Sequence, residues 1–222
     1  MVLVFDFDGT LHDTAHLYGC AFRKAYAWLV EQGQAPEREY SDAELTRWLG
    51  VSAPDMWKSF MPQLPDAVWQ HASAIIGREM VSQIHQGNAR LFPGIPEALD
   101  RLKAEGRHMA VLSNCRHGYM EAHREAFDLD RWFDAYFCAE DYGFIPKEEI
   151  YAAIEAAFPG EDNVIIGDRD SDFRVGIVHG RPVIGCAYGF GSEQELSVCD
   201  AVIDSPAELP QTVRRLFRTA RP

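Results

Sequence analysis

The chain has 222 residues and a formal net charge of −13 at pH 7, with 47% hydrophobic and 25% charged residues. This length can bury a full core and suits one large domain, or a domain with a smaller cap. The composition is that of an ordinary globular protein. The acidic balance argues against a nucleic-acid surface, which normally carries a basic stripe. It does not exclude a phosphorylated substrate, because a local cation can overcome a distant acidic field.

The five cysteines are scattered along the chain and form no C-x-x-C pair. This arrangement is typical of buried thiols in a reducing compartment rather than of a disulfide or zinc framework. The first strand-like run begins at residue 2, which leaves no room for a signal peptide, and no apolar run is long enough to span a bilayer. We therefore expect a cytoplasmic protein that binds neither membranes nor nucleic acid.

An apolar run rich in β-branched and aromatic residues begins at Val2 and ends in Asp6 and Asp8, which Gly9 and Thr10 follow. The run predicts a buried strand, and the Gly-Thr pair predicts a turn after it. Ligands of open α/β sheets bind at the carboxyl ends of strands. Two acids at that place cost desolvation energy unless a cation or a reaction uses them. The alternative is that both acids are solvated and lead into a loop. Because the strand is ending at this point, the side chain of Asp8 can also point away from that of Asp6.

Between about residues 14 and 88 no strand-like run occurs. Asp13-Thr14 is a helix start signal, and apolar residues at helical spacing follow from Ala15 to about Glu31. A longer helix is predicted from Asp66 to about Ile84. We predict a helical cap over residues 15–88, inserted into a core that is formed by residues 1–14 and 89–222.

Strands and helices alternate in the rest of the chain. The predicted strands cover residues 109–112, 135–138, 164–166, 183–185 and 201–203, and the predicted helices cover 95–105, 118–127, 148–158, a segment from 171, and 206–218. Apolar runs without polar alternation are typical of a parallel sheet covered on both faces. We therefore predict an α/β fold with a doubly wound, Rossmann-like parallel sheet.

Two further strand or helix ends carry polar side chains. Ser113 and Asn114 follow the strand at 109–112, and such groups can bind phosphate oxygens without adding charge, although a routine turn also uses them. Lys147 stands at the start of a helix, where the helix dipole prefers anions. This placement is explained if Lys147 neutralises a bound phosphate or carboxylate. The alternative is a solvated surface lysine.

Three acids, Asp168, Asp170 and Asp172, follow the buried strand at 164–166. Carboxylates suit Mg²⁺, which takes one or two of them and completes its shell with waters and substrate phosphate. The alternative is that these acids lie at the N-terminus of a helix, where the helix dipole and capping favour them, with Asp170 or Ser171 as the N-cap. Asp168 is nearest to the strand and is the better candidate ligand.

Taken in order, these segments resemble the four motifs of the haloacid dehalogenase-like hydrolases, most of which are phosphatases with an aspartate nucleophile. The matching segments are Asp6-Phe7-Asp8-Gly9-Thr10, Ser113-Asn114, Lys147, and Gly167-Asp168 with Asp172. The helical insert and the return to the core at Pro93-Gly94 resemble the phosphoglycolate phosphatase and β-phosphoglucomutase branch. One departure is Glu148, because many relatives have proline after the lysine of the third motif.

The resemblance implies Mg²⁺-dependent hydrolysis of a small phosphate monoester. Asp6 would attack phosphorus and form an aspartyl-phosphate, and Asp8 would act as general acid and then as general base. Mg²⁺ would bind a carboxylate oxygen of Asp6, the backbone carbonyl of Asp8 and the side chain of Asp168, with Asp172 orienting these ligands. The expected phosphate-binding residues are Gly9, Thr10, Ser113, Asn114 and Lys147.

Two other functions are possible for this motif set. A phosphomutase of the β-phosphoglucomutase type has a histidine where this chain has Tyr18 and an arginine where it has Ala53, and both departures favour a phosphatase. A non-catalytic binding module on the same fold is the second alternative, since a fold does not fix a function. A dehalogenase of the family is disfavoured, because it needs neither the second aspartate nor Mg²⁺.

The expected partner is a small phosphorylated metabolite, and the protein is expected to be a monomer or a homodimer. Phosphoglycolate, a sugar phosphate and a nucleotide are all open as substrates. In the cap, Arg47, Trp57 and Lys58 are candidate substrate contacts.

Overall fold

The computed structural model describes the backbone of residues 1–219 and the side chains of residues 1–216. Its centre is a six-stranded sheet in the order β3-β2-β1-β4-β5-β6, and all neighbouring strands are parallel. The strands are β1 (Val2–Phe5), β2 (His108–Ser113), β3 (Ala135–Cys138), β4 (Asn163–Gly167), β5 (Val183–Cys186) and β6 (Ala201–Ile203). The predicted doubly wound parallel sheet is therefore confirmed.

Strand β1 lies in the middle of the sheet and is buried on both faces. Leu3 and Phe5 belong to one hydrophobic cluster, whereas Val2 and Val4 belong to the other. This burial explains why the run is apolar without interruption. Strand β1 pairs with β2 on one side and with β4 on the other, so the strand order reverses there. Such a reversal is where open α/β sheets bind their ligands.

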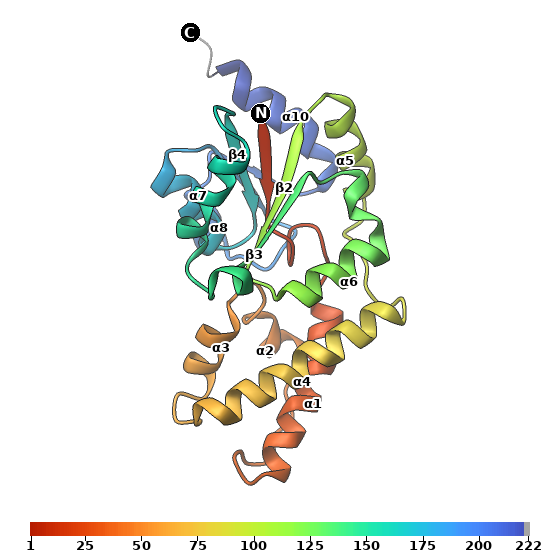
Figure 1. Cartoon of the computed structure of the whole chain (residues 1–222), viewed down its shortest axis with the longest axis vertical. Coiled ribbons are helices and arrows are strands. Elements are labelled where there is room, and N and C mark those ends of the chain that lie inside the picture. Colours follow the sequence, from red (N-terminus) through yellow and green to blue (C-terminus); the bar gives the residue numbers. More distant parts are fainter. Residues whose placement is uncertain (220–222) are drawn as a thin grey trace.

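Helices cover both faces of the sheet (Figure 1). One face packs against α7 (Lys147–Ala157), α8 (Asp170–His179) and the short α9 (Glu193–Leu196). The other face packs against α5 (Ile95–Ala104), α6 (His117–Phe127) and α10 (Leu209–Thr219). Three short 3-10 turns, η1 (Leu129–Arg131), η2 (Ala139–Tyr142) and η3 (Pro206–Glu208), complete this layer structure.

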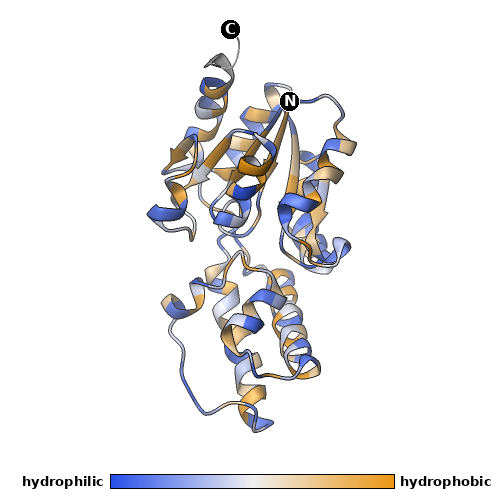
Figure 2. Ribbon diagram, turned by 90° about the vertical axis from the view of Figure 1, so that its left-hand side faces the viewer, coloured by the Kyte–Doolittle hydropathy of each residue, from blue (hydrophilic) through white to orange (hydrophobic). Residues whose placement is uncertain are grey.

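A helical cap lies beyond the carboxyl ends of the strands (Figure 1). It contains α1 (Ala15–Glu31), α2 (Asp42–Thr46), α3 (Ala53–Phe60) and α4 (Asp66–His85). Figure 2 shows alternating hydrophilic and hydrophobic stretches along these helices and mainly hydrophobic strands in the sheet. The helical cap after the first strand is confirmed, whereas the division at residues 14 and 88 into separate domains stays a prediction.

Two segments differ from the sequence-based expectation. The helix predicted over residues 206–218 is divided into η3 and α10, because Pro210 has no N–H to continue the first turn. Helix α9 was not predicted, since four residues are too few to show a helical period. Within residues 1–219, no helix combines the length and the hydropathy that crossing a membrane requires.

Candidate active site

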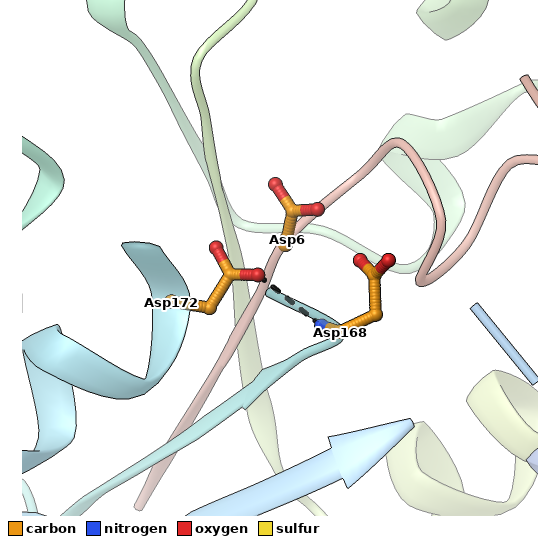
Figure 3. Close-up of side chains that lie close together, drawn as sticks. All are labelled: Asp6, Asp168 and Asp172. Carbon is orange, nitrogen blue, oxygen red and sulfur yellow. Dashed lines mark hydrogen bonds between the residues drawn. The ribbon is translucent and has the colours of Figure 1, made fainter. Parts of the chain in front are cut away.

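Three buried aspartates meet just beyond the carboxyl ends of β1 and β4. Asp6 follows β1, Asp168 follows β4, and Asp172 lies in the first turn of α8 (Figure 3). The register pairs Phe5 with Ile166, so both strands end at nearly the same level. One carboxylate oxygen from each aspartate lies within 4.8 Å of the others, and each residue is at most 4% exposed. The solvated-acid alternative is therefore wrong for Asp6.

Lys147 lies between two of these acids. Its Nζ is 2.5 Å from Oδ1 of Asp6 and 2.6 Å from Oδ1 of Asp172, and the residue is only 2% exposed. Burial alone would lower the pKa of Lys147, but the charges of Asp172 and Asp6 outweigh it and raise this pKa. The side chain is thus a buried ammonium that neutralises carboxylates, and the solvated-lysine alternative is wrong.

The charges of this cluster do not balance. Burial, followed by the charge of Asp172, raises the pKa of Asp6 well above its ordinary value and raises the pKa of Asp168 to about 7. Oδ2 of Asp6 is buried and has no hydrogen-bond partner among the described residues. Three carboxylates beside one ammonium, with an oxygen left unsatisfied, fit a divalent cation with oxygen ligands.

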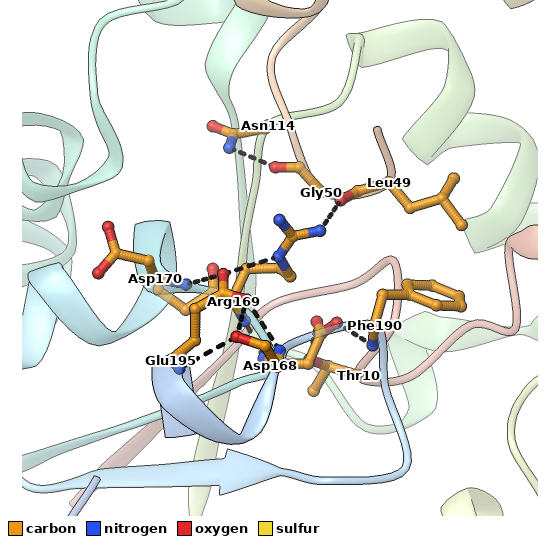
Figure 4. A network of polar contacts seen from close by, with 11 residues as sticks. Thr10, Leu49, Gly50, Asn114, Asp168, Arg169, Asp170, Phe190 and Glu195 are labelled. Atoms are coloured by element: carbon orange, nitrogen blue, oxygen red, sulfur yellow. Dashed lines mark hydrogen bonds and ion pairs between the residues drawn. The ribbon is translucent and has the colours of Figure 1, made fainter. Parts of the chain in front are cut away.

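The loop after β1 holds Asp168 in place. The hydroxyl of Thr10 donates to Oδ1 of Asp168 at 3.1 Å, and the N–H of Phe190 donates to Oδ2 at 2.8 Å (Figure 4). Gly9 has φ +93°, and a Cβ at this position would lie 2.3 Å from Oδ2 of Asp168. Its N–H donates to the carbonyl of His12 at 2.9 Å. Gly9 and Thr10 therefore shape the carboxylate cluster, a role that their prediction as phosphate-binding residues did not include.

Asp172 organises the start of α8. Its Oδ2 accepts the N–H of Asp168 at 3.2 Å and the N–H of Arg169 at 3.0 Å. The prediction that Asp170 or Ser171 caps this helix is wrong, because the carboxylate three residues after Arg169 takes that role. The side chain of Asp170 is exposed.

Asp8 belongs to a second network at the end of β1. Its Oδ1 accepts a hydrogen bond from the Thr14 hydroxyl at 2.5 Å and from the Tyr119 hydroxyl at 2.7 Å, and His12 Nδ1 lies at 3.1 Å. Burial alone would raise the pKa of Asp8, but the hydrogen bonds from His12 and Thr14 lower it. Thr14 is the residue before α1, but its side chain makes no capping hydrogen bond to the helix. The Thr14 hydroxyl donates to Asp8 instead.

His123 extends this network. Its Nε2 lies 3.4 Å from Nε2 of His12, and its Nδ1 lies 3.0 Å from the carbonyl of Tyr119. Sequence reasoning missed His12, Thr14, Tyr119 and His123. The sequence contains one indication of this network. Tyr119 and His123 are four residues apart in a predicted helix, so their side chains must lie on the same face.

The pKa of His123 predicts how stability depends on pH. Burial, followed by the proximity of His12, lowers this pKa from 6.5 to about 3. Between these values the unfolded chain binds a proton that the folded protein excludes, so the free energy of unfolding falls as the pH falls below 6.5. A single group contributes up to about 1.4 kcal/mol per pH unit. We expect His123→Gln to reduce this slope in urea denaturation curves measured between pH 6.5 and 4.

The matched control is His16→Gln, which removes an exposed histidine from α1. Its stability should keep the slope of the unsubstituted protein. If the curves of His123→Gln and the unsubstituted protein ran parallel over this range, His123 would not be the buried neutral group described above.

Two residues of the core contact the loop between α2 and α3. Nδ2 of Asn114 donates to the carbonyl of Gly50 at 2.9 Å, and the guanidinium of Arg169 donates to the carbonyl of Leu49 at 3.0 Å (Figure 4). Arg169 also donates to Glu195 at 3.0 Å. Asn114, predicted to bind phosphate, thus uses its amide N–H to join the core to the cap.

A pocket of about 130 Å³ lies between the strand ends and the cap. Asp6, Asp8 and Ser113 line its core side. The three candidate substrate contacts of the cap are not among its lining residues. Arg47 and Lys58 are exposed, with Arg47 stacked on the ring of Trp48, and Trp57 is buried against Phe60. The sequence does not show which face of each helix meets the core, and a role of these three residues as substrate contacts stays a prediction.

The model of the haloacid dehalogenase-like hydrolase family matches residues 3–186. The chain belongs to this family. A phosphoglycolate phosphatase of Agrobacterium fabrum is 30% identical over 220 residues, which cover 93% of this chain and 89% of the relative. A 5′-nucleotidase of Pseudomonas aeruginosa is 28% identical over 200 residues, which cover 87% of this chain and 86% of the relative.

Two solved structures share the fold. A predicted phosphatase from Clostridium acetobutylicum has a TM-score of 0.83 at 22% identity, covering 96% of this chain and 98% of its own. CbbY from Rhodobacter sphaeroides in complex with phosphate has a TM-score of 0.76 at 22% identity, covering 94% and 95%. The family predicted from the motifs and the prediction of a phosphatase enzyme are confirmed.

Proposed function

We propose that the protein is a Mg²⁺-dependent phosphatase that hydrolyses small phosphate monoesters through an aspartyl-phosphate on Asp6. The observation that carries the proposal is the buried cluster of Asp6, Asp168 and Asp172 beside the ammonium of Lys147. Within residues 1–216, Oδ2 of Asp6 has no hydrogen-bond partner. The relatives named as phosphatases support the same reaction class.

A carboxylate oxygen of Asp6, the side chain of Asp168 and the backbone carbonyl of Asp8 would hold Mg²⁺. When bound, the ion supplies positive charge that offsets the repulsion between the anionic nucleophile and the anionic phosphate. Asp172 orients these ligands, because Lys147 engages one of its oxygens and the N–H groups of Asp168 and Arg169 engage the other.

Catalysis would proceed in two steps. A carboxylate oxygen of Asp6 forms a bond to phosphorus while the bond to the leaving oxygen breaks, and Asp8 gives that oxygen a proton. Asp8 then takes a proton from the water that releases phosphate from Asp6. The hydrogen bonds from Thr14 and Tyr119 hold the Asp8 carboxylate in one orientation, and its lowered pKa keeps it ionised in the free protein. Ser113 and Lys147 would bind the oxygens of the transferring group.

Removal of the metal tests this function directly. We expect phosphate release from a panel of small esters in the presence of Mg²⁺, loss of release after treatment with EDTA, and recovery when Mg²⁺ is added in excess. The physical reason is that the buried acids would otherwise repel the phosphate. Release that persists in EDTA would contradict the metal requirement, and no release from any ester would contradict the phosphatase itself.

We also propose the cytoplasm as the place of action and a small phosphorylated metabolite as the partner. The five cysteines are free thiols, which supports a reducing compartment. Whether the protein is a monomer or a homodimer stays a prediction.

A further inference from the structure

We propose that the pocket beside Asp6 selects a phosphate monoester whose alcohol is uncharged and presents a flat apolar ring. Alcohols that carry a second anionic group, such as the carboxylate of phosphoglycolate, would be disfavoured. This inference rests on the proposed function, because the pocket would hold the alcohol while Asp6 attacks the phosphorus. It goes further by naming the chemical class of the alcohol.

The walls of the pocket are mostly apolar. Helix α4 contributes Ile76 and Met80, α3 contributes Met56, and the loop before α3 contributes Val51. On the core side, Phe144 adds an aromatic ring to the lining. Such walls gain free energy when they cover apolar surface, and they cannot replace the water around a charged group.

The pocket offers no uncompensated positive charge for a second anion. Among the described lining residues, Arg116 is the one with a cationic side chain. Its guanidinium donates to Oε1 of Glu140 at 2.7 Å and lies 5.6 Å from the ring centre of Phe144. Lys147, the buried cation of the carboxylate cluster, is already engaged by Asp6 and Asp172. A carboxylate on the alcohol would therefore lose its hydration near Asp8 without gaining a free cation.

One polar group in the pocket is available to an uncharged ligand. Tyr18 of α1 lines the pocket and is 8% exposed, and its hydroxyl has no hydrogen-bond partner within the described part of the chain. Burial raises the pKa of Tyr18, so the hydroxyl stays a neutral donor. A buried donor without a partner is costly, and a ring nitrogen, carbonyl or hydroxyl of the alcohol would satisfy it.

Two matched pairs of esters test the preference, with Mg²⁺ present throughout. Benzyl phosphate is compared with 2-phosphoglycolate, and uridine 5′-monophosphate is compared with ribose 5-phosphate, which has no base. We expect kcat/KM to be at least about tenfold higher for the ring-bearing ester of one or both pairs. A preference in the first pair indicates an aryl alcohol, and a preference in the second pair indicates a nucleoside.

A kcat/KM that is equal or higher for the ring-free ester in both pairs overturns the inference and leaves the phosphatase proposal intact. Absence of release from all four esters and from the wider panel contradicts the phosphatase, and the inference fails with it.

Glu140→Gln tests the role of charge within the pocket. The substitution releases Arg116 from its ion pair, while the amide oxygen of Gln can still accept the N–H of His117, which lies 3.0 Å from Oε2 of Glu140. We expect kcat/KM for 2-phosphoglycolate to rise about fivefold and that for benzyl phosphate to change less than about twofold.

The matched control is Glu121→Gln, which removes a partner of Arg124 on the exposed side of α6. An unchanged ratio between the two esters in Glu140→Gln would contradict the proposed charge selection.

Discussion

Asp6→Asn is expected to reduce Mg²⁺-dependent phosphate release by at least about 10⁴-fold, as removal of a catalytic nucleophile does in other hydrolases. The amide has nearly the shape of the carboxylate, but its oxygen is too weak a nucleophile to attack phosphorus. The fold should persist, because the substitution removes one of three crowded acids and leaves Lys147 paired with Asp172. The measurement is the rate of phosphate release from the best ester of the panel, with circular dichroism as the check on folding.

Asp170→Asn is the matched control for this experiment. Asp170 lies in the same acidic segment as Asp168 and Asp172, but its side chain is exposed and points away from Asp168 (Figure 4). Its activity should stay within about twofold of the unsubstituted protein. Full activity of a folded Asp6→Asn protein would exclude Asp6 as the nucleophile.

Lys147→Met is expected to lower the free energy of unfolding by about 3–5 kcal/mol, in addition to abolishing activity. Methionine keeps the length of the apolar stem, but Asp6 and Asp172 lose their shared cation at a buried position. The loss follows from the charges left unpaired rather than from a cavity. Urea denaturation at pH 7 measures it.

A second variant distinguishes electrostatic from packing effects. Adding Asp172→Asn to Lys147→Met removes one of the two unpaired acids, so the double variant should regain at least about 1 kcal/mol relative to Lys147→Met. Lys58→Met is the control, because Lys58 is exposed on α3 and its loss should leave the denaturation midpoint unchanged. If Lys147→Met unfolded at the same urea concentration as the unsubstituted protein, the buried ion pairs would contribute nothing to stability.

The sheet and the strand-end acids could be predicted because both depend on local sequence. A run such as Val2–Phe5 has no polar residue, so it fits a strand that is covered on both faces. Parallel strands end at one edge, and this brings Asp6 and Asp168 together although they lie far apart in the sequence. The helical cap could also be predicted from local sequence, because its apolar residues recur at helical spacing.

The partners of the acids could not be predicted, because they come from distant segments. Tyr119 reaches Asp8 from α6, and the Thr10 hydroxyl donates to Asp168, which lies on a different strand end. The residues of the cap that line the pocket could not be predicted for a related reason. Lys58 and Trp57 are neighbours in the sequence, but the rotation of α3 places Lys58 in solvent and buries Trp57.

The contacts of Asn114 and Arg169 with the cap end on the carbonyls of Gly50 and Leu49, which are groups that every amino acid carries. Substitutions at position 49 would thus leave this pair of hydrogen bonds available, whereas position 50 favours glycine because its φ is +79°. On the cap side, docking therefore uses main-chain carbonyls, whereas the recognition of the alcohol proposed above uses the side chains of the cap. Mutation can therefore change what the enzyme accepts without first having to rebuild how its two parts meet.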